Sequence, residues 1–237
     1  MSGNFPFNIW NGGLNNVFDK GATYKDFLFY FNNNKDLPIR FNFSNILADD
    51  LDFTDAMTNS ILEIFNTYNC FIEISNIPFM EYIQKKYSNY NFIFSKEADW
   101  IADFFPELIN TILNYNKFTL ISLPTRFNNN IKELELFNHP EKLELTINPL
   151  CPNNCQFKES CAIQEHKMQL EYSESSQYRE CTKRYNIFNT QLITLDDIVK
   201  NYLPIGICHF NIDGWENNYT ETNYLNFYIS YFIKKEF

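Results

Sequence analysis

Short segments with β-strand character alternate with helical patterns along the chain, and this alternation constrains the fold more than any other feature. Strands are predicted at Phe5–Trp10, Ile39–Ser44, Cys70–Ser75, Phe92–Ser95, Phe118–Leu123, Leu143–Asn148, Tyr185–Phe188 and Ile207–Asp213. The intervening segments have the apolar spacing and capping residues of helices. Eight alternating units favour a parallel sheet covered by helices, and they predict a (β/α)8 TIM-like barrel. A barrel that lacks one unit, or an open parallel sheet, is the alternative, because the first, fourth and seventh strand patterns are the weakest.

Chain length and composition agree with one domain. The chain has 237 residues, of which 45% are hydrophobic, and a complete α/β barrel typically needs about 250 residues. No long linker rich in proline, glycine or serine interrupts the sequence. We therefore predict that residues 1–237 form a single barrel domain.

The charge distribution argues against two classes of partner. A net charge of −10 repels nucleic acid, and the basic residues form only short pairs such as Lys85-Lys86 and Lys183-Arg184. No apolar run approaches the roughly 20 residues that a membrane-spanning helix needs, and the N-terminus lacks a signal peptide pattern. The sequence favours a cytoplasmic protein that acts on a small molecule or a peptide.

Four of the predicted strands alternate between an apolar and a more polar face. The more polar faces hold Arg40, Asn42 and Ser44; Phe71, Glu73 and Ser75; Glu144, Thr146 and Asn148; and His209, Asn211 and Asp213. If the apolar faces pack on helices, the polar faces line the barrel, and their last residues meet at the rim where barrel enzymes carry their sites. The alternatives are an antiparallel sheet with one solvated face, or an interior that satisfies its own hydrogen bonds.

This polar interior supplies the candidate catalytic residues. Glu73 and Glu144 are candidate acids, although either could instead pair with Arg40. His209 lies beside Asp213 and could carry a proton or bind a metal. The alternative for His209 is a histidine that is only hydrogen-bonded within the barrel.

A cluster of cysteines follows the predicted strand Leu143–Asn148. Cys151, Cys155 and Cys161 occur within eleven residues, and Cys181 lies twenty positions further on. Four thiolates can hold zinc or a 4Fe–4S cluster, and His166 is an alternative fourth ligand. Four unrelated reduced thiols are the simpler alternative.

The two remaining cysteines have a different predicted role, and several common catalytic and nucleotide-binding motifs are absent from the sequence. Cys70 and Cys208 fall on apolar strand faces, which predicts buried structural thiols. The chain has only six glycines and lacks a phosphate-binding glycine loop, G-x-S-x-G and H-E-x-x-H. Nucleotide binding through a glycine-rich loop is therefore not expected.

Three stretches resemble collagenase-like peptidase-type barrels and their small uncharacterised bacterial relatives. They are RFNFSN at Arg40–Asn45, LELTINPLCPNNCQFKESC at Leu143–Cys161, and GICHFNIDGW at Gly206–Trp215. In the family, a strand that ends in asparagine precedes a cysteine-bearing loop, and the small relatives have histidine near the position of Cys161. The last stretch is similar to the family's G-x-x-x-F-K-I-E-G-R, with Asn211, Asp213 and Trp215 at the charged positions.

The resemblance implies a TIM-like barrel. It also implies an iron–sulfur protein, because several members assist oxygen-independent hydroxylation of ubiquinone precursors or RNA, while others are called peptidases. The leading hypothesis is an iron–sulfur enzyme of hydroxylation or group transfer. The alternatives are a non-catalytic barrel in which a structural zinc pins the cysteine loop, and a peptidase-like hydrolase.

Overall fold

The computed structural model describes residues 2–3, 9–10, 25, 29, 32–33, 39–68, 70–100, 106–114, 117–147, 149, 160, 163–164, 166–167 and 193–212. Within these ranges the strands form one sheet in which every pair is parallel and the strand order follows the sequence. The strands are β1 (Ser2–Gly3), β2 (Ile39–Phe43), β3 (Cys70–Ile74), β4 (Asn91–Phe94), β5 (Phe118–Ser122), β6 (Leu143–Thr146) and β7 (His209–Asn211). Because β1 has only two residues, the other six strands make up most of the sheet.

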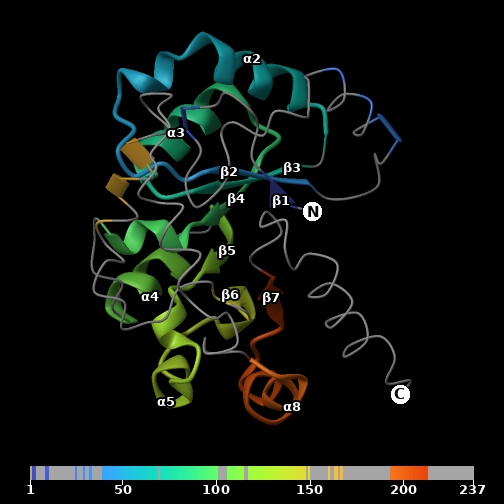
Figure 1. Ribbon diagram of the computed structural model, residues 1–237, viewed down its shortest axis with the longest axis vertical. Helices are drawn as coiled ribbons and strands as arrows, with labels where there is room; N and C mark the ends of the chain where they lie inside the picture. Colours follow the sequence, from blue (N-terminus) through green and yellow to red (C-terminus); the bar gives the residue numbers. More distant parts are fainter. Residues whose placement is uncertain are drawn as a thin grey trace.

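Helices connect successive strands, as a parallel order requires. The α-helices are α2 (Ala56–Phe65), α3 (Ile77–Lys86), α4 (Pro106–Asn114), α5 (Ile131–Leu134) and α8 (Leu195–Asp197). The shorter helical turns are η1 (Asp52–Thr54), η2 (Lys96–Trp100), η3 (Thr125–Phe127), η4 (Pro140–Lys142), the π-helix η6 (Ile198–Tyr202) and η7 (Leu203–Ile205). Figure 1 shows α2 and α3 beside the first strands, and α4 and α5 beside β5 and β6.

Local sequence signals explain where these helices begin. The side chain of Asp55 accepts a hydrogen bond from the backbone N–H of Thr58 and caps α2. Asn76 does the same for α3, and Pro78 stands in the first turn, where its missing N–H costs nothing. Thr194 and Asp197 form a reciprocal capping box at the start of α8.

The apolar faces of the strands pack against the helices and form the core. Phe41, Ile72, Leu145 and Ile121 are almost completely buried on the strands, and Leu62 is buried on α2. Each fully buried side chain of this size contributes roughly 1.5–3 kcal/mol of transfer free energy. The opposite face of the sheet carries Arg40, Glu73 and Glu144.

The opposite face is concave, because side chains meet across it. Arg40 on β2 contacts Glu144 on β6, and three strands lie between these two. In a flat sheet, strands four places apart are separated by about 19 Å, since neighbours are about 4.8 Å apart. That gap is too wide for an arginine and a glutamate to bridge, so the sheet curls into a half-barrel. We call this side the concave face. The pairing of residues between neighbouring strands places Arg40, Glu73, Glu144 and His209 on it.

Most of the strand predictions are confirmed, with differences at the ends. The antiparallel alternative is wrong, because all strand pairs are parallel. The segment Phe5–Trp10 was expected to be the first strand, but β1 is Ser2–Gly3, and Ile9 and Trp10 form a turn. Trp10 is fully buried there, packed edge-on against Phe43 and Phe79, and its indole N–H donates to the backbone oxygen of Asp52 at 2.8 Å.

The predicted seventh strand does not lie between β6 and β7, which correspond to the sixth and eighth predicted strands. Tyr185–Phe188 lies outside the described residues, but Glu144 on β6 is in direct register with His209 on β7. No strand therefore comes between the sixth and eighth predicted segments. No helix within the described ranges has the length and apolar character required to cross a bilayer.

Candidate functional site

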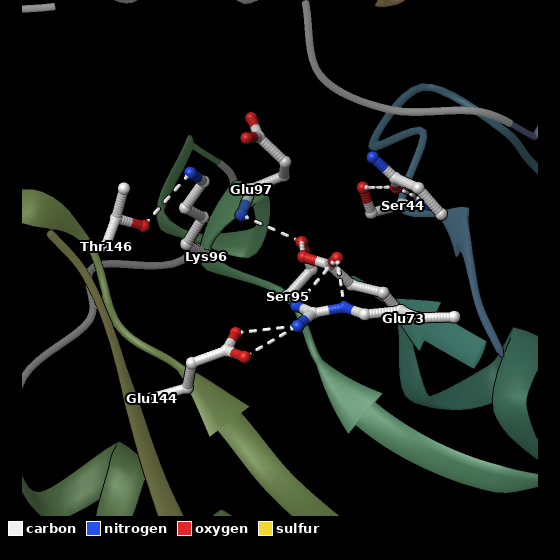
Figure 2. A network of polar contacts seen from close by, with 9 residues as sticks. Ser44, Glu73, Ser95, Lys96, Glu97, Glu144 and Thr146 are labelled. Carbon is white, nitrogen blue, oxygen red and sulfur yellow. Dashed lines mark hydrogen bonds and ion pairs between the residues drawn. The ribbon is translucent and has the colours of Figure 1, made fainter. Parts of the chain in front are cut away.

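Arg40 joins the two glutamates of the concave face. Its Nε donates to Glu73 Oε2 at 3.0 Å, and its Nη2 lies 2.8 Å from the same oxygen. On its other side, Nη1 donates to both carboxylate oxygens of Glu144 at 2.8 and 2.7 Å. Figure 2 shows Glu73 and Glu144 with their carboxylates directed toward one another, and the contacts appear as dashed lines between them.

The three side chains form an ionic cluster that is largely shielded from solvent. Their exposed fractions are 11% for Arg40, 11% for Glu73 and 9% for Glu144. Burial opposes the charge of Arg40, but the two glutamate charges outweigh it, so the pKa of Arg40 is raised above its usual value. One cation facing two carboxylates leaves the cluster with one net negative charge. Removing the arginine would strand two buried anions, which is far more costly than the pair itself is stabilising.

Ser95 links this cluster to the end of β4. Its hydroxyl donates to Glu73 Oε1 at 2.7 Å, and it accepts the backbone N–H of Glu97 at 3.3 Å. The backbone N–H of Ser95 donates to Ile74 at the end of β3. The network therefore extends from the middle of the concave face to the carboxyl ends of the strands.

Thr146 and Asn128 continue the network at the carboxyl end of β6. Lys96 Nζ lies 3.4 Å from the hydroxyl of Thr146, and Asn128 Nδ2 donates to the backbone oxygen of Thr146 at 2.6 Å. The hydroxyl of Tyr202, on the π-helix, donates to the backbone oxygen of Asn128. Asn128 Oδ1 and Ser122 Oγ are buried and have no hydrogen-bond partner within the described part of the chain. Such atoms often mark a place where water or a ligand completes the bonding.

The segment after the cysteine cluster is anchored at the same rim. His166 is fully buried, and its backbone oxygen accepts a hydrogen bond from Asn45 Nδ2 at 3.1 Å. The same amide group also donates to the backbone oxygen of Ile9 at 2.9 Å. His166 Nε2 lies 4.0 Å from Glu97 Oε2, and burial lowers the pKa of His166 to about 4. His166 is therefore neutral at physiological pH.

The segment before the cysteine cluster is also fixed. Ile147 donates its N–H to Asn211 at the end of β7 and accepts a hydrogen bond from the N–H of Ile193, each at 2.9 Å. Pro149, two positions before Cys151, is buried. Both flanks of the cysteine segment therefore reach the carboxyl end of the sheet, near the neighbouring residues Lys96 and Glu97.

The structure brings together part of the predicted site. Glu73 and Glu144 lie on the concave face, and both pair with Arg40, which confirms the alternative that foresaw such a pair. His209 is half-buried on β7, in register with Glu144. Asp213 and the predicted ligands Cys151, Cys155, Cys161 and Cys181 lie outside the described residues. Among the residues that are described, no group of three or more His, Cys, Asp or Glu side chains could hold a metal ion.

Of the predictions for the other two cysteines, one is confirmed and one is wrong. Cys70 is fully buried, as expected, and burial raises the pKa of its thiol to about 12. The prediction for Cys208 is wrong, because this residue is exposed. Cys208 precedes β7 and follows Gly206, whose φ of 94° belongs to the turn after η7. The alternation of a strand therefore does not extend to Cys208.

Several rim residues were not foreseen from the sequence. Ser95 was predicted only as a strand end, and Lys96, Glu97, Asn45 and Asn128 were not singled out. Their common signal is position, since each follows a strand directly or lies in the loop after it. In parallel α/β proteins these are the positions that build binding sites.

The chemistry available to this site follows from the charges. Glu73 and Glu144 accept hydrogen bonds from Arg40, and Glu73 also accepts one from Ser95, so both carboxylates serve as acceptors within this cluster. His209 lies beside Glu144 in register on β7 and is half-buried. The concave face therefore combines a charged cluster with a half-buried histidine at its edge strand.

Comparisons with known proteins add no family assignment. No family model matches the chain, and neither a curated protein nor a solved structure matches it.

Proposed function

We propose that the protein is a metal- or iron–sulfur-binding enzyme of the barrel type, with its substrate site on the concave face. The observation that supports this most is the Arg40–Glu73–Glu144 cluster, which makes the inner side of a parallel half-barrel polar and charged. A sheet that needed only stability would place apolar side chains there, because buried ion pairs contribute little to stability. Barrel enzymes carry their active sites at the carboxyl rim, to which this polar network leads.

The proposed metal ligands are thiolates of the cysteine segment. Cys151, Cys155 and Cys161 follow β6 directly in the sequence, and Ile147 and Pro149, which lead into the segment, are placed at the carboxyl end of the sheet. A bound iron–sulfur cluster would supply electrons beside the concave face, whereas zinc would supply a Lewis acid. The residues of this chain would bind the substrate, orient it against Glu144, and carry a proton at His209.

We also propose that the half-barrel belongs to a complete or slightly incomplete (β/α)8 barrel. Its two edge strands, β1 and β7, are the first and last in sequence order, which is the arrangement that a closing barrel requires. Closure would cover the open edges and enclose the charged cluster. The substrate proposed for such a site is a small molecule or a peptide end.

A structural zinc is the second candidate. It is favoured by the contacts on either side of the cysteine segment, because Thr146 and His166 approach the adjacent residues Lys96 and Glu97. A metal would then close a loop whose ends are already held together, and it would stabilise the fold without taking part in a reaction.

The deciding experiment is purification of the full chain without oxygen, followed by an absorption spectrum and analysis of iron, sulfide and zinc. Stoichiometric iron and sulfide with a broad visible charge-transfer band, both lost in Cys151→Ser, would support the enzyme proposal. One zinc per chain and no visible band would support the structural site. A chain that holds no metal, and whose stability is unchanged in Cys155→Ser, would contradict both.

A further inference from the structure

We infer that the concave face binds a primary ammonium group, which Ser122, Asn128 and Glu144 hold through three oxygen atoms. This inference rests on the substrate site proposed for the concave face and deepens it, because it names the chemical class of the substrate. It does not depend on a bound metal. All three side chains belong to the described part of the protein.

Four serines form a row of small side chains across the concave face. Ser44, Ser75, Ser95 and Ser122 each come directly after a core residue, and these core residues are paired across β2, β3, β4 and β5. Because side chains alternate along a strand, the serines point away from the core and toward the concave face. All four are buried, with exposed fractions of 4% or less. We call them the serine row, and their small size leaves little side-chain volume from these four strands at this level.

Ser122 is the member of the serine row whose hydroxyl has no partner. The hydroxyls of Ser44, Ser75 and Ser95 each donate a hydrogen bond to an oxygen atom of the protein. Ser122 Oγ is buried, and no described residue forms a hydrogen bond with it. An unmade hydrogen bond at a buried hydroxyl costs free energy, and a ligand that completes the bond recovers this cost.

Two further acceptors lie beside Ser122. Glu144 on β6 is in direct register with Ser122, so the two side chains project to the same face from strands about 4.8 Å apart. Asn128 Nδ2 donates to the backbone oxygen of Thr146, two positions after Glu144. Since a carbonyl oxygen accepts only a donor, Oδ1 of Asn128 is the amide atom that faces away from Thr146. This Oδ1 is also buried without a hydrogen-bond partner within the described ranges.

The charges at the concave face and its rim favour a cation. The described charged side chains that meet there are Arg40, Lys96, Glu73, Glu97 and Glu144. Two cations and three carboxylates give a formal charge of −1, and the adjacent His166 is neutral at physiological pH because burial lowers its pKa to about 4. Each of the three guanidinium nitrogens of Arg40 already contacts a glutamate. An anionic ligand would therefore meet a negative field, and Arg40 is engaged elsewhere.

A primary ammonium group matches these acceptors in number and charge. It carries three N–H donors and one positive charge. Ser122 Oγ and Asn128 Oδ1 each accept one hydrogen bond, and Glu144 can accept the third because a carboxylate has lone pairs beyond those that Arg40 uses. An alcohol supplies one donor and no charge, whereas a guanidinium supplies five donors and would leave some of them unpaired.

The test compares three probes that share an alkyl chain and differ in charge, namely n-butylammonium, 1-butanol and butyrate. Their binding to the full chain is measured by ligand-observed NMR titration at constant ionic strength. We expect n-butylammonium to bind at least tenfold more tightly than either of the others. Glycinamide, measured in parallel, distinguishes the two sources of the ammonium group: tighter binding than n-butylammonium assigns it to a peptide N-terminus, and weaker binding to a small alkylamine.

Ser122→Ala is the decisive variant, because it removes an acceptor without breaking a hydrogen bond of the fold. It should weaken n-butylammonium binding about tenfold or more, which is the loss expected for a hydrogen bond to a charged group. Its melting temperature should equal or slightly exceed that of the wild-type chain. Ser75→Ala is the matched control, since it changes a partnered hydroxyl of the same serine row and should bind n-butylammonium like the wild-type chain.

A crystal structure of the wild-type chain grown with n-butylammonium gives a second readout. The amine nitrogen within hydrogen-bond distance of Ser122 Oγ and Asn128 Oδ1 would support the inference, and an ordered water alone at this position would overturn it. Equal binding of n-butylammonium and 1-butanol, or unchanged binding in Ser122→Ala, would also overturn it while leaving a substrate site on the concave face. Failure of all the probes to bind would instead refute that substrate site itself.

Discussion

Arg40 on β2 and Glu144 on β6 are in contact across the concave face, although 104 positions and three strands separate them. The contact is possible only because the sheet curls, and in turn it holds the two sides of the half-barrel at a fixed distance. Glu73, on the strand next to that of Arg40, accepts a second hydrogen bond from the same guanidinium group and gives the cluster its net negative charge. The cluster therefore has a structural role in addition to any role in binding.

Replacing Arg40 by methionine should be strongly destabilising. Arg40→Met leaves Glu73 and Glu144 buried without their cation, and loss of one partner from a buried ion pair typically costs about 3–5 kcal/mol. Urea unfolding should show this as a lower midpoint. Lys200→Met is the control, because the Lys200–Asp196 pair is exposed to solvent and such pairs contribute little to stability. A loss below about 1 kcal/mol in Arg40→Met would contradict a buried, coupled cluster.

Removing all three charges together should be far less harmful than removing the arginine alone. In Arg40→Met combined with Glu73→Gln and Glu144→Gln, no uncompensated anion remains, and Ser95 can still donate to the amide oxygen at position 73. Replacement of whole buried ion clusters is often neutral or stabilising, so we expect the triple variant to recover at least about 2 kcal/mol relative to Arg40→Met. Equal destabilisation of the two variants would show that the loss comes from packing and not from charge.

The strands and the two faces of the sheet could be predicted from the sequence, but the side-chain pairs on the concave face could not. Alternation in Leu143–Asn148 placed Glu144 and Thr146 on one side, and the same period placed Arg40 and Glu73, because strand geometry repeats every two residues. The choice of partners was left open, since contacts between residues 33 and 104 positions apart depend on how far the sheet curls. Curl depends on packing of the whole sheet against its helices, which no local pattern encodes.

Two strand predictions extended too far. Cys208 was assigned to a strand by alternation but lies just before β7, and Phe5–Trp10 was assigned to a strand although Ile9 and Trp10 form a turn. Trp10 is buried because Asn45 and Asp52 bind its backbone oxygen and indole N–H, respectively. Such tertiary contacts override local strand preference. The metal ligands, and the assignment of residues 1–237 to one barrel domain, stay predictions.

The two described cysteines should differ sharply in reactivity. At pH 8, iodoacetamide should modify Cys208, which is exposed, and should leave Cys70 unmodified, because Cys70 is buried and its thiol pKa is raised to about 12. Mass spectrometry of peptides from the folded chain measures both in one sample. Cys70 should become reactive only after unfolding in urea, and Cys208→Ser should remove the early product. Rapid modification of Cys70 in the folded chain would show that β3 is not packed in the core.

Acid should destabilise the metal-free protein through His166. Its pKa is near 6.5 in the unfolded chain and about 4 in the folded chain, so the unfolded state binds more protons between these values. The contribution of His166 to the free energy of unfolding is therefore complete above pH 6.5 and is lost as the pH falls towards 4, by up to about 3 kcal/mol. Urea unfolding of wild-type and His166→Gln chains across this range, after metal removal, measures the difference. A difference that does not change with pH would mean that His166 is solvated, and the placement of Glu97 beside a buried imidazole would then be wrong.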